Sequence, residues 1–147
     1  MSKGKIFFLT WIFLSPFYLL AADLTIQVND LRNNKGTLRV YLYEQAKKQD
    51  FLASGVKSFA CRQYAEIKEG SAKVRCEKVP PGIYALTFFH DENDNFKVDS
   101  NFVGIPKEGY GFSLNYKPKL ATPSFEEVQF EVTTADQNMI LKAIYSL

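Results

Sequence analysis

The chain has 147 residues, with 18 lysines and arginines against 16 aspartates and glutamates, and a formal net charge of +2. This length is that of one domain with a core of its own, and the near balance of charge argues against a nucleic-acid-binding protein. The single histidine and two cysteines argue against a structural zinc site built from these residue types.

The first residues have the pattern of a secretion signal. Lys3 and Lys5 precede an apolar run over residues 6–20, and small residues follow at Ala21 and Ala22. A basic start, a short apolar segment and a small-residue exit are typical of a signal peptide, whereas a spanning helix needs about 20 apolar residues. We predict a signal peptide over residues 1–22, a single domain over 23–147 that is periplasmic or secreted, and no membrane span in the mature chain. Because the leader carries two lysines and no acid, the mature domain keeps 16 basic and 16 acidic residues.

Short alternating runs predict strands through most of the remaining chain. Apolar and polar residues alternate at 24–29, 38–43, 73–77 and 127–132, and residues 139–147 are apolar enough for a buried strand. The sequence RNNKG at 32–36 predicts a hairpin turn after the first strand. Residues 44–59 are compatible with a short helix or turn that turns Phe51 and Leu52 inward, and no other segment has a helical period.

The two cysteines, Cys61 and Cys76, favour a disulfide, because an even count is usual in exported proteins. Closing a loop of about 15 residues would stabilise the fold by about 3 kcal/mol on the chain-entropy view. Two buried free thiols are the alternative.

The sequence VPPGIYALTFF, residues 79–89, predicts a turn followed by a central strand. Pro81 fixes φ, and Gly82 can supply the positive φ of a type II turn. The strand is apolar on both faces, as expected when both are covered. About seven strands separated by turns predict an all-β fold, a seven-stranded antiparallel β-sandwich. The Pro-Gly-x-Tyr turn resembles that of prealbumin-like sandwiches, and an immunoglobulin-like sandwich fits the same pattern.

The segment HDENDNFKVD, residues 90–99, is the candidate metal site. Oxygen-bearing side chains recur at every second position, a spacing that suits Ca²⁺, which takes six to eight oxygen ligands. The candidate ligands are Asp91, Asn93, Asn95, the backbone carbonyl of Lys97, and Asp99. An EF-hand loop would have glycine where Phe96 stands, and a residue of that size tolerates positive φ poorly. The alternative is a loop without metal that is held by its own Asx hydrogen bonds.

The segment GIPKEGYGFS, residues 104–113, is the candidate contact surface. Its glycines permit a tightly folded backbone on which Tyr110 and Phe112 form an aromatic platform, or a lid that packs back on the sandwich. With His90 and Glu108 these residues are the candidate contacts for a protein, a glycan or a small molecule.

Catalysis has weaker support in the sequence. A hydrolase would use His90 as base, Asp91 or Glu108 to orient it, and Ser113 as nucleophile, yet no Gly-x-Ser-x-Gly elbow or phosphate-binding glycine loop is present. We therefore predict a non-catalytic binding or interaction module that uses residues 91–113, with Ca²⁺ as the only candidate cofactor. A loop with a purely architectural role, and a partner surface elsewhere, is the remaining alternative.

These residues together resemble the signature of an exported bacterial family catalogued as domain of unknown function 2141. The residues that carry the resemblance are Pro81, Gly82, Tyr84, His90, Asp91, Asn93, Asn95, Lys97, Asp99, Asn101, Gly104, Pro106, Glu108, Gly109, Tyr110, Gly111, Phe112 and Ser113. The likeness extends to residues 32–43 and 123–130, and Phe96 departs from it where glycine is expected. It implies a secretion signal followed by one small β-domain, and it implies no activity.

Overall fold

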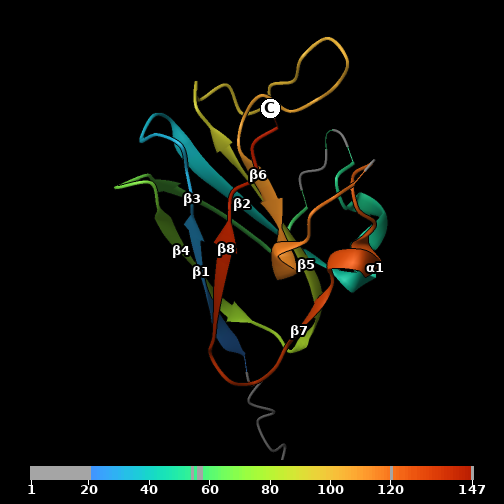
Figure 1. Cartoon of the computed structure of the whole chain (residues 1–147). Coiled ribbons are helices and arrows are strands. Elements are labelled where there is room, and N and C mark those ends of the chain that lie inside the picture. Colours follow the sequence, from blue (N-terminus) through green and yellow to red (C-terminus); the bar gives the residue numbers. More distant parts are fainter. Residues whose placement is uncertain (1–20, 54, 56–57, 120, 147) are drawn as a thin grey trace, which may run out of the picture.

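The computed structural model describes residues 21–53, 55, 58–119 and 121–146 (Figure 1). Most of the predicted signal peptide, residues 1–20, lies outside these ranges. Ala22, the last residue of that predicted segment, is a buried strand residue opposite Val79. In the described ranges, no helix has both the length and the apolar character needed to cross a bilayer.

The chain is mostly β-structure in two sheets. The smaller sheet has the order β4-β1-β8 and the larger one the order β3-β2-β5-β6, with β7 paired to β5. The strands are β1 (Ala22–Asn29), β2 (Thr37–Glu44), β3 (Cys61–Glu66), β4 (Ala72–Val79), β5 (Gly82–Asp91), β6 (Tyr110–Phe112), β7 (Phe130–Val132) and β8 (Gln137–Lys142). The described residues also include three short helical segments, η1 (Gln45–Asp50), η2 (Ser113–Asn115) and α1 (Phe125–Val128).

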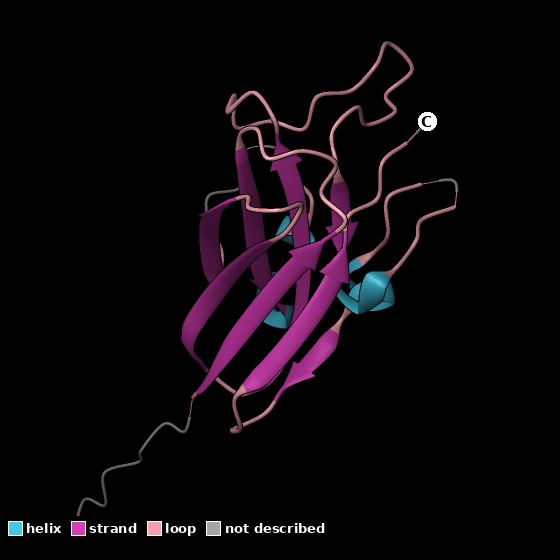
Figure 2. Cartoon of the chain, turned by 60° about the vertical axis from the view of Figure 1, so that its left-hand side comes forward, coloured by secondary structure: helices cyan, strands magenta, loops and turns pink. Residues whose placement is uncertain are grey.

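The core lies between the two sheets, which form two layers in Figure 2. Alternation on β1 buries every second side chain, and β2 and β5 supply the facing row. Its fully buried large members include Leu24, Ile26, Val28, Leu38, Val40, Leu42, Leu86, Phe88 and Leu141. Since burying one such side chain is worth about 1.5–3 kcal/mol, this layer is the main stabilising contribution to the fold.

Both edges of the two sheets are joined. The predicted disulfide is present, and it links Cys61 on β3 to Cys76 on β4 with a Cα–Cα distance of 5.9 Å. On the other side the chain leaves β8 and reaches β6, where Tyr110 and Ile144 exchange backbone hydrogen bonds of 3.0 and 2.8 Å. These two links therefore connect the edge strands of one sheet to those of the other, and the second link involves β6, which contains the candidate residues Tyr110 and Phe112.

Several expectations about the strands are corrected by the structure. There are eight strands in the described ranges rather than seven, and β8 pairs with β1 in parallel, so the fold is not purely antiparallel. Residues 32–36 do not close a hairpin, because β1 and β2 belong to different sheets and the segment crosses between them. The structure confirms an all-β class with two sheets, while the prealbumin-like or immunoglobulin-like assignment remains a prediction.

Three local expectations also differ. Residues 127 and 128, the start of a predicted strand, lie in the helix α1 instead, because Ser124 and Glu127 form a capping box in which Ser124 N–H donates to Glu127 Oε2 at 2.8 Å. Gly82 does not have a positive φ; Lys78, before the two prolines, does at +53°. Leu52 also has a positive φ and is exposed, whereas Phe51 packs edge-on against Tyr43.

Candidate functional site

The predicted central strand β5 has the two covered faces that its sequence indicated. Leu86, Phe88 and His90 point into the core, while Thr87 and Phe89 point to the outer face of the larger sheet. This division separates the candidate residues into an inner group and an outer group.

His90 belongs to the inner group and is fully buried. Its Nε2 lies 2.7 Å from the carbonyl oxygen of Lys35, and its Nδ1 lies 2.7 Å from the hydroxyl of Tyr145. Because a carbonyl only accepts, Nε2 carries the proton; the Tyr145 hydroxyl then donates to Nδ1 and accepts the N–H of Arg32 at 3.1 Å. Every polar atom in this network has a partner, so His90 acts as a core residue that fixes the sheet end.

Asp91 begins the loop on the opposite face, and it is also fully buried. Its Oδ2 accepts from Arg39 Nε at 2.5 Å and from the backbone N–H of Phe96 at 2.9 Å, while Oδ1 accepts from the N–H of Asn95 at 3.0 Å. Arg39, on β2, is 3% exposed. The carboxylate therefore neutralises a buried guanidinium and folds the next five residues around itself.

The loop beyond Asp91 is held by further acidic side chains. Glu108 is buried, and its two carboxylate oxygens accept the backbone N–H groups of Glu92 and Asp99 at 2.8 and 2.9 Å. The Asp99 carboxylate accepts from the side-chain amides of Asn93 and Asn95 at 2.7 and 3.0 Å. The loop thus has the Asx and carboxylate bonding that the metal-free alternative describes.

These contacts bear on the proposed calcium ligands. In the part of the chain that the structure describes, no group of three or more His, Cys, Asp or Glu side chains is placed to hold a metal ion. Both oxygens of Asp91 face Arg39 and backbone donors, and the Lys97 N–H donates to Asn95 Oδ1 at 2.9 Å. Calcium at Asp91, Asn93, Asn95, Lys97 and Asp99 stays a prediction, and this donor arrangement does not favour it.

The hydrolase residues are kept apart in this fold. Ser113 is fully buried; its hydroxyl accepts the N–H of Leu86 at 3.1 Å and donates to the carbonyl of Val128. Leu86 and His90 are four residues apart on β5, which is about 13 Å along a strand. Neither His90 nor Glu108 is exposed enough to meet a ligand in this conformation.

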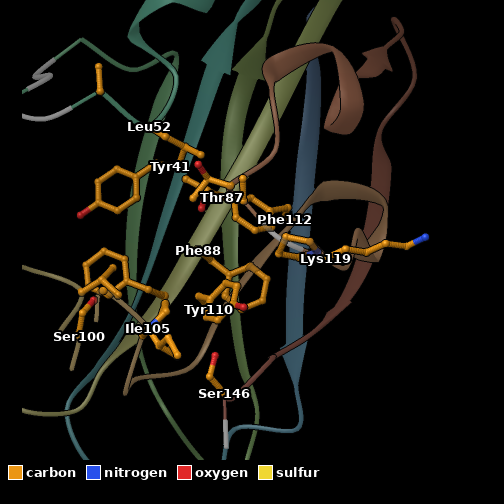
Figure 3. Close-up of a pocket in the computed structure, with 18 of the residues that line it drawn as sticks. Tyr41, Leu52, Thr87, Phe88, Ser100, Ile105, Tyr110, Phe112, Lys119 and Ser146 are labelled. Carbon is orange, nitrogen blue, oxygen red and sulfur yellow. The ribbon is translucent and has the colours of Figure 1, made fainter. Parts of the chain in front are cut away.

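The outer face of the larger sheet carries a groove of about 680 Å³. Tyr41, Thr87 and Tyr110 lie on its floor, and Ile105 and Ser100 stand on the loop that forms one wall (Figure 3). Its lining residues are Tyr41, Tyr43, Leu52, Ala53, Thr87, Phe88, Phe89, Val98, Ser100, Val103, Gly104, Ile105, Pro106, Tyr110, Phe112, Pro118, Lys119, Ala121, Thr122 and Ser146. Of the four predicted contact residues, Tyr110 and Phe112 line this groove and His90 and Glu108 do not.

The groove continues toward β3. A second hollow of about 290 Å³ shares Tyr41, Tyr43 and Ala53 with the first and adds Phe59, Arg62, Tyr64 and Phe96. Within this region Tyr41 contacts Phe59 with ring centroids 4.8 Å apart, and it stacks on Phe89 at 6.0 Å. The floor is therefore a row of aromatic rings across β3, β2, β5 and β6.

Sequence reasoning named Tyr110 and Phe112 as contacts but did not identify the aromatic residues of β2 and β5 as part of the same surface. Tyr41 and Tyr43 stand at the polar positions of the alternation over residues 38–43, and Phe89 stands at an outward position of β5. Large aromatic residues on the outer face of neighbouring strands are the signal that could have indicated a second covered or ligand-binding surface.

Burial of the groove tyrosines gives a measurable pH dependence. Burial raises the pKa of Tyr41 to about 12, with Tyr64 adding to the effect, and burial raises the pKa of Tyr43 to about 12. Unfolded tyrosines lose their protons near pH 10, so the folded state holds more protons between pH 10 and 12. Stability is therefore unaffected by these groups below pH 10 and falls as the pH rises from 10 to 12.

We expect two tyrosines to ionise last when folded protein is titrated by absorbance at 295 nm. Tyr43→Phe should remove one late-titrating group, whereas Tyr64→Phe, at an exposed ring, should leave the Tyr43 step in place. If all tyrosines of the folded protein titrated together near pH 10, the groove floor would be open to solvent, contrary to this structure.

The fold and site can be compared with known proteins. Residues 26–140 match the family described as "Uncharacterized protein conserved in bacteria (DUF2141)". The chain belongs to this family. The match confirms the resemblance drawn from the sequence signature, and it covers every strand except the first residues of β1 and the last of β8.

Other comparisons add little. No curated protein matches the chain. Among solved structures, the crystal structure of a "putative adhesin" from Bacteroides ovatus is similar with 11% identity and a TM-score of 0.38. The alignment covers 97% of this chain and 50% of that one, so this chain spans half the length of that protein. A likeness this low carries no argument about function.

Proposed function

We propose that this member of the family is an exported, non-catalytic binding module whose ligand occupies the aromatic groove on the outer face of the larger sheet. The observation that supports the proposal is the groove itself, which has a volume of about 680 Å³ and is lined by Tyr41, Phe89, Tyr110 and Phe112 among others. Pockets of this size, mostly apolar with a few polar groups, are the usual form of small-ligand sites.

The ligand that suits such walls has an extended apolar face. Aromatic rings supply most of the floor, and the wall residues Val98, Val103 and Ile105 are aliphatic. The hydroxyls of Ser100 and Thr122 at the margin offer a few hydrogen bonds for orientation. An apolar small molecule or an apolar peptide segment fits this chemistry better than a highly charged one.

The loop of residues 91–109 serves this site as a wall. Asp91 and Glu108 hold it by bonds to its backbone, so that Val98, Val103 and Ile105 stand over the sheet face. In this proposal the family signature residues are the frame of the groove, and the aromatic residues Tyr110 and Phe112 are its contact surface.

Binding of 1-anilinonaphthalene-8-sulfonate, an aromatic dye with one sulfonate group, tests the proposal. We expect native protein to bind one equivalent saturably, and Thr87→Trp, which fills the floor, to weaken binding by at least about tenfold, since a lost apolar contact of one ring is worth more than about 1.4 kcal/mol. The matched control is Thr25→Trp on the outer side of β1 in the other sheet, which should bind within about twofold of the native protein. If both variants fold and the two substitutions change the affinity for the dye equally, the dye binds outside the groove and the proposal is wrong.

A further inference from the structure

The same loop also exposes large apolar side chains to solvent, some of which line the groove as well. Phe102 is 99% exposed and Val103 62% exposed, and Ile105 and Val98 are both 41% exposed. We name these four residues the apolar tip. An exposed cluster of large apolar side chains costs solubility, so it marks an interaction site when it is built into an ordered segment.

The apolar tip is ordered by its own hydrogen bonds. Asn101 Oδ1 accepts the N–H groups of Val103 and Ile105 at 3.0 and 2.9 Å, and the Asn101 N–H donates to the Ile105 carbonyl at 2.8 Å. Gly104 completes the turn with φ +83°. A capping asparagine and a left-handed glycine thus present Phe102 and Val103 outward.

Over residues 97–107, which contain the apolar tip, two lysines stand against one acid, Asp99, so the segment carries a net charge of +1. Lys97 and Lys107 are exposed at its two ends, and neither forms an ion pair within the described ranges. Asp99 is half-buried and accepts two side-chain amides, which leave its charge in place, while Glu92 Oε1 is paired with Arg32 Nη2 at 2.6 Å. An apolar tip between two free ammonium groups is complementary to a layer of anionic headgroups over hydrocarbon.

The shape of the segment points to the same partner. The loop projects past the ends of the strands, at the end of the molecule where the C-terminus also lies (Figures 1 and 2). A stable protein interface buries about 800 Å² on each partner, which a narrow convex tip does not offer, whereas a bilayer interface closes around it.

We propose that the apolar tip docks this domain on an anionic lipid bilayer, with Phe102 and Val103 in the interface and Lys97 and Lys107 against the headgroups. The inference is independent of what occupies the groove. Because Val98, Val103 and Ile105 belong both to the tip and to the groove wall, a docked domain would hold its groove beside the membrane surface.

Fluorescence quenching by brominated lipids tests the depth of this position directly. The chain has one tryptophan, Trp11, so Trp11→Phe/Phe102→Trp places a single reporter in the tip of the full chain. The matched control is Trp11→Phe/Ile140→Trp, at a position 60% exposed on β8. Both proteins are mixed with vesicles of phosphatidylcholine and phosphatidylglycerol in equal parts, or of phosphatidylcholine alone.

We expect the reporter at 102 to shift to the blue and to be quenched in the anionic vesicles, and the reporter at 140 to remain unquenched even if the N-terminal segment contacts lipid. Adding Lys97→Glu and Lys107→Glu to the reporter at 102 should weaken binding by at least about tenfold, since one basic residue near an anionic surface contributes about 1 kcal/mol. Quenching at 102 no greater than at 140 would overturn the proposal, as would quenching that is equal in the two lipid mixtures and survives both lysine substitutions.

Discussion

Replacing Asp91 with alanine should lower the free energy of unfolding by about 3–5 kcal/mol, the usual loss when one partner of a buried ion pair is removed. The substitution leaves the Arg39 guanidinium 3% exposed, with Asp94 Oδ1 at 3.5 Å as its remaining anionic neighbour. It also removes the acceptor for the N–H of Phe96 and leaves the N–H of Asn95 with only Asn93 Oδ1, at 3.2 Å. Urea unfolding followed by circular dichroism measures the loss.

Two controls separate the buried charge from simple truncation. Arg39→Met/Asp91→Asn removes both charges and should cost less than Asp91→Ala alone, because no guanidinium is left without a partner. Asp99→Ala, which takes away an acceptor for two exposed side-chain amides, should cost about 1 kcal/mol. If the double variant were less stable than Asp91→Ala, the Arg39–Asp91 ion pair would itself stabilise the folded state. The loss in Asp91→Ala would then not come from leaving the Arg39 guanidinium buried without a partner.

The same variants test whether the loop that begins at Asp91 binds Ca²⁺. If Asp91 acts through Arg39 and the loop backbone, its substitution costs the same in CaCl₂ at about 10 mM and in EDTA. A native protein that gains stability in calcium, with the gain abolished by Asp91→Ala, would restore the metal-site prediction for this loop.

The sequence was sufficient for the parts of the fold that depend on local alternation. Strands β1, β2, β4 and β5 follow period-two patterns, and the disulfide follows from the cysteine count. The inward row that ends at His90 was also predictable, because the side-chain direction of a strand is fixed by counting residues.

What the sequence did not predict depends on pairing between distant segments. The parallel contact of β8 with β1 joins the two ends of the domain, and no local pattern specifies it. The groove likewise needs Tyr41, Phe89 and the loop over residues 98–106 to meet, although they come from three separate stretches. Residues 127 and 128 begin the alternating run over 127–132, yet a capping box at Ser124 places them in a helical turn.

Two of the glycines on which the sequence resemblance rests, Gly109 and Gly111, have a physical reason that only the structure supplies. A Cβ on Gly109 would lie 2.5 Å from the Tyr145 ring, and one on Gly111 would lie 2.3 Å from the Phe88 ring. Both glycines are needed for close approach of a side chain, so that the Tyr145 hydroxyl reaches His90 and β6 packs on the core. They do not serve a flexible ligand loop.

Phe96 shows how a contact with a residue distant in the sequence can offset an unfavourable backbone conformation. Its φ of +67° is unfavourable for a large side chain, which argued against such a turn from sequence alone. In the structure its ring lies over the Arg39 guanidinium, 3.9 Å from the centroid, and Tyr64 lies over the same group at 4.9 Å. A cation–π contact at a partly desolvated site contributes about 0.5–2 kcal/mol, comparable with the strain of about 1–2 kcal/mol.

Replacing Gly36 with alanine should lower the free energy of unfolding by about 2–4 kcal/mol, from a left-handed backbone and steric overlap together. Gly36 has φ +64°, and a Cβ there would lie 1.9 Å from the carbonyl oxygen of Asp91. That oxygen belongs to the backbone at the end of β5, so relief requires β5 or the 32–36 segment to move. Either movement also disturbs the Arg39–Asp91 pair and the bond from His90 to the Lys35 carbonyl.

The matched control for Gly36 is Gly104→Ala. Gly104 has φ +83°, and a methyl group at this position would meet nothing within 4 Å, so its substitution carries the backbone cost alone, about 1 kcal/mol. The difference between the two losses measures the overlap with Asp91, and thermal unfolding of both variants at the same pH gives it. Equal losses of stability in the two variants would mean that residues 32–36 can move away from Asp91 at no cost. The close contact between these residues and the end of β5 would then not help to hold Asp91 in place.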